Sequence, residues 1–358
     1  MPELQQNKGP KYVVLANRFK AQIEQGELKP GDRLPSFTQL RAQFGVTPTT
    51  IERVYGLLEQ ENLIVRERGR GTFVCEPEER ATTGVVGVAG MTLAQQPHPY
   101  WARLMEGLHE AAARAGLELL LLNETSQIKW EKVDGVISYE TRATPARALL
   151  DRLPPGMPFV SALVATHEGV SVLADDYRGA FDVTRHLLEM GHRRIAYLFD
   201  PLSTQRIAGY HDALRQARVA ADGNWVRHVH DEINGAFCHY LEAGHRAMEA
   251  WLREDWAQLG CTALMTQNDD TAIGSIRALR AHGLNVPDDV SVTGFDGTEV
   301  GQYFSPRLTT VEVPLREIGV TAVETLLRQM NGEASKVSSL VLPVRLRVGE
   351  STTTALKS

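Results

Sequence analysis

From residue 85 onward, short and almost continuous apolar runs alternate with longer segments in which apolar residues recur at helical spacing. The apolar runs are GVVGVAG, LELLLLN, VDGVISY, PFVSALVA, RIAYLFD, CTALMTQ and VSVTGFD. Helical segments such as PYWARLMEGLHEAAARAG, which a glycine ends, separate most of them. Strands that are apolar on both faces and alternate with helices are typical of parallel sheets covered on both sides. The pattern therefore predicts an α/β body with parallel sheets.

Residues 11–75 follow a different pattern, which predicts three helices and then two short strands. Apolar spacing places the first helix at about residues 12–25. Ser36 and the glutamine three residues later fit a capping box at the start of the second helix. For the third helix, Thr47 fits the N-cap and Pro48 the first turn, where a missing N–H costs nothing. The segment LIVRERGRGTFV predicts two strands joined by a glycine-rich tip.

The stretch EPEERATTG, residues 76–84, is polar and lacks periodicity, so we interpret it as a linker. This divides the 358 residues into an N-terminal domain at 1–75 and a body at 85–350. A hydrophobic content of 43% with 23% charged residues is typical of a globular protein with a sizeable core.

Charge is unevenly distributed between these two parts. The whole chain has a formal net charge of −6, which by itself argues against a nucleic-acid partner. Residues 1–75, however, contain 11 Lys and Arg against 8 Asp and Glu, a net charge of +3, which leaves −9 for the remainder. A basic N-terminal domain on an acidic body indicates that this domain meets an anion and the body does not.

The third predicted helix has one apolar and one polar side when it is drawn at 100° per residue. Its core side consists of Ile51, Val54, Tyr55 and Leu58, and its outward side of Thr49, Glu52, Arg53 and Gly56. The outward side is small, polar and only weakly basic. The predicted hairpin adds positive charge at its tip through Arg66, Arg68 and Arg70, and Gly69 and Gly71 allow the backbone to approach closely. Such a tip can neutralise phosphates or enter a minor groove, although each arginine alone also fits an ordinary solvated surface.

Three stretches resemble the winged-helix domain of the GntR family, namely KPGDRLPS, FGVTPTTIERVYGLLEQENLI and RERGRGTFV. They cover nearly all of residues 10–75. The resemblance implies a winged helix-turn-helix that binds double-stranded operator DNA through the starts of the second and third helices and the wing tip. Carried over by position, the implied DNA-binding residues are Ser36, Thr38, Thr47, Thr49, Thr50, Arg68, Gly69 and Arg70, joined by the outward-facing Arg53.

This N-terminal domain departs from the family's pattern where many members carry charged residues. Phe37 and Thr38 stand in place of Glu-Arg, Pro48 replaces an arginine after the helix cap, and Glu52 replaces another arginine. Hydroxyl groups can bind phosphates or bases, and a glutamate can accept from cytosine N4. We therefore expect DNA binding with an operator sequence that differs from those of arginine-bearing members.

The body resembles the effector-binding region of LacI/GalR-type repressors, which is built like a periplasmic sugar-binding protein. The matching stretches are VLADDYRGAFDVTRHLLEMGHRRIAYLFD, RIAGYHDAL, TQNDDTAIGSIRALRAHGLNVPDDVSVTGFDGTE and LTTVEVP. The resemblance is specific over about residues 170–345. It implies two α/β subdomains joined by crossovers, with a small-molecule effector in the cleft between them. A GntR-type winged helix joined to this body resembles the arabinose-responsive repressor class.

Five residues are the candidate effector ligands. Arg206, Asn268 and Asp296 stand at the family's ligand positions, near the carboxyl ends of strands where ligands of parallel sheets bind. A sugar offers a ring of hydroxyls and an apolar face, so its site needs polar side chains and an aromatic platform. Tyr100 and Trp101 are the candidate platform. Alternative roles are a surface arginine, a helix cap for Asn268, a strand end for Asp296 and core positions for both aromatics.

The chain departs from this family between two of the apolar runs. Only nine residues, 124–132, separate LELLLLN from VDGVISY, where the family usually has a further helix and loop. Asp175 and Asp176 fall in the family's ligand region as well, but a turn or crossover role suits them equally.

Other functions find little support in the sequence. Three widely spaced cysteines form neither a disulfide framework nor a zinc-ligand spacing, which favours a reducing cytoplasm. The N-terminus has no apolar signal region and no apolar stretch reaches about 18 residues, so we expect neither secretion nor a membrane span. We find no convincing phosphate loop, catalytic triad or cofactor motif, and we expect no metal, no cofactor and no catalytic residue.

The sequence thus predicts a cytoplasmic, ligand-responsive transcription regulator, most simply a repressor that binds operator DNA and a small polar effector such as a sugar. We expect a homodimer, because a symmetric pair of winged helices reads a palindrome with more affinity than one module. The alternative is a solute-binding protein or a sugar-acting enzyme with the same body fold. The basic winged helix argues against the first, and the lack of a placed acid–base pair argues against the second.

Overall fold

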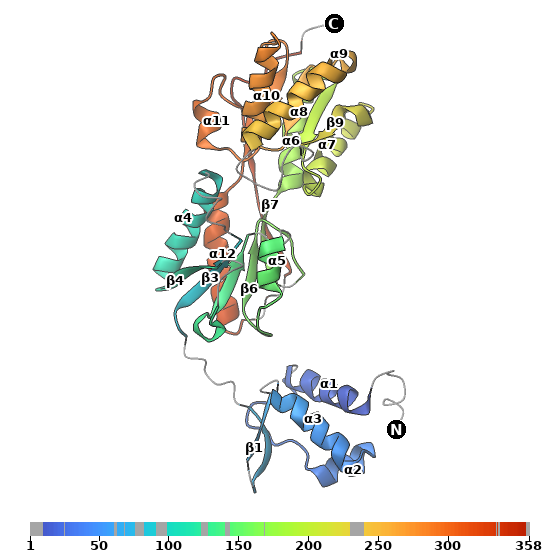
Figure 1. Cartoon of the computed structure of the whole chain (residues 1–358), viewed down its shortest axis with the longest axis vertical. Coiled ribbons are helices and arrows are strands. Elements are labelled where there is room, and N and C mark those ends of the chain that lie inside the picture. The colour runs from blue at the N-terminus through green and yellow to red at the C-terminus, as the bar shows by residue number, and fades with distance from the viewer. Residues whose placement is uncertain are drawn as a thin grey trace. The chain divides into compact units, whose positions relative to one another are not determined.

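The protein is described here from a computed structural model of the chain (Figure 1). The described residues are 10–24, 26–60, 63–67, 69–75, 82–90, 99–122, 128–139, 144–167, 169–229, 240–333, 335 and 337–355. The chain divides into two compact units, Met1–Thr82 and Thr83–Ser358. Residues 76–81, most of the segment expected to be a linker, lie outside the described residues.

The first unit is a winged helix, as the sequence predicts. Its helices are α1 (Lys11–Glu24), α2 (Phe37–Phe44) and α3 (Pro48–Gln60), and its strands are β1 (Ile64–Glu67) and β2 (Gly71–Val74). The strands pair antiparallel, with Ile64 opposite Val74. A core of apolar side chains from all three helices and both strands holds the unit together, and it includes the predicted Ile51, Val54, Tyr55 and Leu58.

Local signals fix where α2 and α3 begin. The Ser36 hydroxyl accepts from the backbone N–H of Gln39 (3.4 Å), and the Gln39 side chain accepts from the N–H of Ser36 (2.7 Å), which is the predicted capping box. Gly45 ends α2 with a left-handed φ of 62°, a conformation that glycine adopts without strain. The Thr47 hydroxyl accepts from the N–H of Thr50 (3.3 Å) at the start of α3.

The first subdomain of the second unit contains a parallel sheet with the strand order β13-β7-β6-β5-β3-β4. Its strands are β3 (Val85–Ala89), β4 (Glu118–Leu122), β5 (Gly135–Ser138), β6 (Phe159–Ala162), β7 (Val170–Ala174) and β13 (Ser339–Leu342). Helices α4 (Pro99–Arg114) and α12 (Leu315–Met330) cover one face, where they pack against Val88 and Ile137. Helix α5 (Thr144–Leu150) packs on the other face against Val136 and Phe159.

The second subdomain repeats this layered plan with the parallel strand order β11-β10-β8-β9. Its strands are β8 (Ile195–Phe199), β9 (Val226–His228), β10 (Ala263–Thr266) and β11 (Ser291–Thr293). Helices α6 (Asp176–Glu189) and α7 (Thr204–Gln216) cover one face, and α8 (Tyr240–Glu254), α9 (Trp256–Leu259) and α10 (Asp269–Ala281) the other. The short helix α11 (Glu299–Tyr303) follows β11. Both faces of each sheet are covered, which explains the continuous apolar runs of the sequence.

The chain crosses between the two subdomains at residues 174–176, 312–315 and 342–345. Two of the crossing segments form an antiparallel pair, β12 (Thr310–Glu312) and β14 (Arg345–Arg347). The short segment 124–132 contains a single 3-10 turn at Trp130–Lys132, and residues 123–127 lie outside the described residues.

Glycine permits the close contact between α8 and α10 on one face of the second sheet. A Cβ atom built at Gly274 of α10 runs into the carbonyl oxygen of Leu241 in α8, and one built at Gly244 of α8 lies 2.5 Å from the carbonyl oxygen of Thr271 in α10. Both neighbours are backbone atoms, which cannot turn aside as a side chain can. The spacing of these two helices therefore depends on the absence of side chains at both positions.

We expect Gly274→Ala to destabilise the body by about 2 kcal/mol, because the added methyl must push α8 and α10 apart. Gly223→Ala is the matched control, since a Cβ there meets nothing within 4 Å. All five tryptophans lie between residues 101 and 256, so urea unfolding followed by tryptophan fluorescence reports on this unit. Equal urea midpoints for the two variants would contradict the packing described here.

Candidate ligand-binding pocket and nucleic-acid interface

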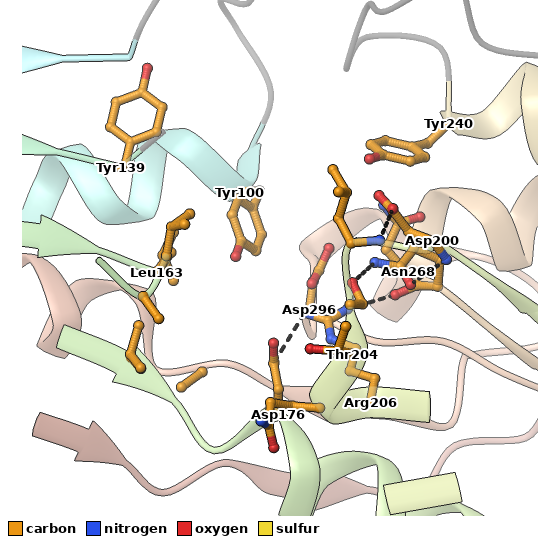
Figure 2. Close-up of a pocket in the computed structure, with 18 of the residues that line it drawn as sticks. Tyr100, Tyr139, Leu163, Asp176, Asp200, Thr204, Arg206, Tyr240, Asn268 and Asp296 are labelled. Atoms are coloured by element: carbon orange, nitrogen blue, oxygen red, sulfur yellow. Dashed lines mark hydrogen bonds and ion pairs between the residues drawn. The ribbon is translucent and has the colours of Figure 1, made fainter. Parts of the chain in front are cut away.

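A cavity of about 260 Å³ lies between the two subdomains of the body, at the carboxyl ends of strands from both sheets. Residues from the first subdomain and the crossings form one wall, and residues that follow β8, β10 and β11 form the other (Figure 2). The lining residues are Tyr100, Trp101, Tyr139, Leu163, Val164, Ala165, Leu173, Ala174, Asp176, Asp200, Leu202, Ser203, Thr204, Gln205, Arg206, Tyr240, Gln267, Asn268 and Asp296. A site at strand ends is where parallel α/β proteins place their ligands.

Arg206, in the first turn of α7, is the central polar group of this pocket. Its side chain is 9% exposed, and its Nη1 donates to the backbone oxygen of Gln267 (2.7 Å). Its Nη2 lies 3.1 Å from Oδ1 of Asp176, and its guanidinium lies over the ring of Phe295 at 3.6 Å from the centroid. Burial alone lowers the pKa of this guanidinium, but Asp176 and Asp296 together outweigh burial and raise it. Arg206 is therefore a fixed cation. Its Nε is buried and has no hydrogen-bond partner among the described residues.

Asp296 follows β11 in a conformation that few non-glycine residues adopt. Its φ is 106°, and residues in this region cost on the order of 1–3 kcal/mol of strain. Burial raises the pKa of its carboxyl well above the usual range, against the opposing effect of Arg206. A strained acidic residue at the wall of a cavity is typical of a site selected for binding rather than for stability.

A buried carboxylate beneath the pocket holds the loop that carries Asp296. The Oδ2 atom of Asp269 accepts from the backbone N–H (2.6 Å) and the hydroxyl (2.9 Å) of Thr298, and its Oδ1 accepts from the hydroxyl of Thr310. Burial raises the pKa of Asp269 to about 6, although these hydrogen bonds work in the opposite direction. Asp269 thereby ties the start of α10 both to the Asp296 loop and to the crossing strand β12.

Asn268 caps α10 and faces the pocket at the same time. Its Oδ1 accepts from the backbone N–H (2.9 Å) and the hydroxyl (2.8 Å) of Thr271, which leaves the amide nitrogen as the group that it can offer to a ligand. The preceding Gln267 joins two loops, since its Oε1 accepts from the N–H of Asp200 (3.1 Å) and its Nε2 donates to the hydroxyl of Ser203 (2.9 Å). These bonds fix the ends of β8 and β10 against each other.

Aromatic rings form the wall contributed by the first subdomain. Trp101 packs between Tyr100 and Tyr139, with ring centroids 4.9 Å and 4.6 Å apart, respectively. Burial raises the pKa of the Tyr100 hydroxyl well above its ordinary value, so this ring stays neutral. Figure 2 shows Tyr100 and Tyr139 on one side of the cavity and Tyr240, Asp200 and Asn268 on the other. The arrangement offers an apolar ring face opposite a wall of polar groups.

All five residues predicted from the sequence, Tyr100, Trp101, Arg206, Asn268 and Asp296, line this one cavity. The sequence reasoning missed Tyr139, Asp200, Tyr240 and Gln267, and it gave Asp176 a turn or crossover role with equal weight. Tyr139 and Asp200 each stand directly after a strand, as do Leu163 and Gln267. Tyr139, Asp200 and Gln267 are the last residues of the runs VDGVISY, RIAYLFD and CTALMTQ, so inspection of the end of every predicted strand, rather than of the family's motif positions alone, finds these three.

The candidate nucleic-acid interface is the surface around the starts of α2 and α3. Ser36, Thr38, Thr47 and Thr49 are exposed there, and Thr50 is half-buried with its hydroxyl 2.9 Å from that of Thr47. Arg53 is exposed as well, and its guanidinium lies 5.7 Å from the ring centroid of Tyr12 in α1. This surface is small and rich in hydroxyls, as the sequence predicts.

The wing differs from the sequence expectation in how its arginines are engaged. Arg66 belongs to β1 rather than to the tip, and its guanidinium contacts Glu52 (2.6 Å) and Glu59 (3.2 Å) of α3. Glu52 therefore links the wing to α3. The sequence had instead suggested that this carboxylate accepts a hydrogen bond from a base. Gly69 and Arg70 are exposed at the tip, with Arg70 paired to Glu67, and Arg68 lies outside the described residues.

Comparison with known proteins assigns both units. Residues 11–74 match the family model of bacterial regulatory proteins of the gntR family, and residues 184–352 match that of the periplasmic binding protein-like domain. The chain is 30% identical over 271 residues to the HTH-type transcriptional repressor CytR of Escherichia coli (strain K12), covering 71% of this chain and 76% of that protein. The chain belongs to the LacI/GalR-type family of transcriptional regulators.

Two further similarities extend over nearly the whole chain of this regulator. The arabinose metabolism transcriptional repressor of Geobacillus stearothermophilus is 27% identical over 365 residues, which cover 96% of this chain and 98% of that protein. A solved structure described as a transcriptional regulator CelR–cellobiose complex has a TM-score of 0.64 at 27% identity, covering 87% of this chain and 94% of that one. The winged helix and the effector domain are thus joined here as in known regulators.

Within the described part of the chain, no helix is long and apolar enough to cross a membrane. The same residues contain no cluster of three or more His, Cys, Asp or Glu side chains that would hold a metal ion.

Proposed function

We propose that this regulator is a repressor that binds operator DNA through its winged helix and releases it when a sugar occupies the pocket of the effector domain. The observation that carries the proposal is the convergence of Arg206, Asn268 and Asp296 opposite the Tyr100–Trp101 wall. Hydroxyl groups of a sugar pair with carboxylate, amide and guanidinium groups, and its apolar face stacks on aromatic rings. The names of the similar proteins, an arabinose metabolism repressor and a regulator in complex with cellobiose, support a sugar.

The crossing segments offer a route from the pocket to the movement of the subdomains. Arg347 of β14 donates to the backbone oxygen of Gly297 (3.1 Å), next to Asp296, and pairs with Glu312 of β12 (2.6 Å). A ligand held by Asp296 on one side and by Tyr100 on the other favours a closed arrangement of the two subdomains. The change in DNA affinity then cannot exceed the difference in the ligand's affinity for the two arrangements.

The regulator acts, in this proposal, as a homodimer in the cytoplasm. One winged helix with a small, hydroxyl-rich reading surface contributes little affinity alone. Two copies related by a two-fold axis bind two half-sites of a palindrome, so that their affinities combine. Ser36, Thr38, Thr47, Thr49, Thr50 and Arg53 are the proposed contacts of each copy, together with Arg68, Gly69 and Arg70 of the wing.

A solute-binding protein and a sugar-acting enzyme remain the competing functions for the body fold. The gntR-family match over residues 11–74 supports a regulator over both. The similar proteins are named as transcriptional regulators and repressors, not as enzymes. Turnover of a sugar that binds the pocket is the result that would favour an enzyme.

We expect the purified regulator to bind its own promoter region more tightly than random duplex, with an affinity that falls as salt rises. Arg70→Ala should weaken binding to all sequences and reduce the salt slope by about 0.9, the value for one phosphate contact. Thr49→Ala should instead change which sequences are preferred. Arg253→Ala, an exposed arginine of α8 paired with Glu249, is the control. Fluorescence anisotropy against salt measures all four proteins, and a wild type without sequence preference would contradict DNA regulation.

A thermal-shift screen with uncharged monosaccharides, disaccharides and nucleosides should yield a ligand that stabilises the wild type. Arg206→Ala and Asp296→Ala should each abolish the shift, because each removes a polar group that faces the ligand. Arg253→Ala should retain it. A ligand whose shift survives both pocket substitutions binds elsewhere, and that result would overturn the proposed site.

A further inference from the structure

We infer that the pocket selects an uncharged ligand, that it rejects the phosphorylated form of the same molecule, and that Asp200 is a residue that sets this selection. The inference rests on the proposed function, because it concerns the effector of the same pocket. No relative's name assigns a charge preference to this chain, and Asp200 is not among the ligand positions implied by the sequence.

The described lining residues carry more acidic than basic side chains. Among the described residues of the wall, the carboxylates of Asp176, Asp200 and Asp296 face a single guanidinium, that of Arg206, and no lysine. Burial raises the pKa of Asp296, and the carboxylates of Asp176 and Asp200 by themselves still outnumber the one guanidinium. Of the segments outside the described residues that adjoin pocket residues, 91–98 and 230–239 contain neither lysine nor arginine, and 140–143 contains one acidic residue, Glu140, and one basic residue, Arg142.

The guanidinium of Arg206 already has a partner on each of its terminal nitrogens. One of its terminal nitrogens is bonded to the Gln267 carbonyl and the other lies against Asp176. Tight phosphate binding uses a fork of donors on an uncompensated cation, and the carboxylate of Asp176 already compensates this guanidinium. Its Nε is buried, with no hydrogen-bond partner among the described residues, so this atom adds no exposed donor for a phosphate.

Asp200 lines the pocket, and hydrogen bonds hold its side chain in place. It stands directly after β8 and is 7% exposed. Its Oδ1 accepts from the backbone N–H of Leu202 (2.8 Å), and its own N–H donates to the Gln267 side chain (3.1 Å). These bonds prevent the carboxylate from turning away from an incoming anion. Like charges repel far more strongly in a partly buried site than in water, so a phosphate meets a cost that a hydroxyl avoids.

The size of the cavity completes the description of the ligand. Its volume of about 260 Å³ lies just below the usual range of about 300–1,000 Å³ for ligand pockets. A small cavity with carboxylates as acceptors, the Asn268 amide as a donor and Tyr100 with Trp101 as a platform fits a one-ring compound with several hydroxyl groups. An anionic substituent on that ring meets a single cation within the described wall, Arg206, which already pairs with Asp176.

The experiment compares matched pairs by isothermal titration calorimetry with the full chain. The probes are ribose with ribose 5-phosphate, glucose with glucose 6-phosphate, adenosine with its 5′-monophosphate, and the hit of the screen above with its phosphate ester. We expect the uncharged member of the binding pair to bind at least tenfold more tightly. Asp200→Asn should reduce the ratio of the two affinities at least threefold. The substitution removes the charge repulsion and retains the oxygen that accepts from the N–H of Leu202.

Asp151→Asn is the control for a lost charge, since Asp151 is exposed, pairs with Arg147 and does not line the pocket. It should leave the gap unchanged. A phosphate ester that binds wild type as tightly as its uncharged partner overturns the charge selection while the proposed function stands. A gap that persists in a folded Asp200→Asn variant, checked by circular dichroism and urea midpoint, overturns the role of Asp200. Binding of no probe and no screened ligand refutes the proposed function itself.

Discussion

The effector domain depends on one buried guanidinium. Arg206 joins three segments that are distant in the sequence, namely Asp176 after the first crossing, the Gln267 carbonyl after β10 and the Phe295 ring after β11. Removing a guanidinium from water is costly, and only several simultaneous partners repay that cost. Once these partners are in place, they fix the strand ends that carry Asp200, Asn268 and Asp296. The same contacts that let Arg206 stay buried thus build the polar wall of the pocket.

A second buried charge links this wall to the segments that join the subdomains. Asp269 holds Thr298 of the Asp296 loop and Thr310 of β12, and Arg347 of β14 holds Gly297 of the same loop. A ligand that pulls on Asp296 therefore acts on both crossing strands, on β12 through the buried hydrogen bonds of Asp269 and on β14 through the half-buried bond from Arg347 to Gly297. Because packed interiors have few intermediate arrangements, such a loop is suited to switching between two states rather than to gradual deformation. This is the physical content of the proposal that a small molecule controls DNA binding.

Much of the fold was predictable because its signals are local. The apolar runs gave the strands, and Ser36, Gly45 and Thr47 marked the ends of helices through their own hydrogen bonds and backbone angles. The five predicted pocket residues were found at the family's motif positions, and Asn268 and Asp296 also stand near strand ends. The pairing of Arg66 with Glu52 was not predictable, since it depends on how the wing lies against α3. The same limit applies to Asp176, whose partner Arg206 lies 30 positions away on another helix.

The central claim is that effector binding in the pocket and operator binding by the winged helix are coupled by one free energy. This coupling can be measured through the affinity of either ligand. The affinity of the operator is determined with and without saturating effector, and the affinity of the effector with and without saturating operator. Thermodynamic linkage requires the two factors to be equal, and typical couplings of about 1–3 kcal/mol correspond to about 5- to 150-fold. The account predicts equal factors of at least fivefold, both lost in Asp296→Ala. An effector that binds the pocket and leaves operator affinity unchanged would contradict it.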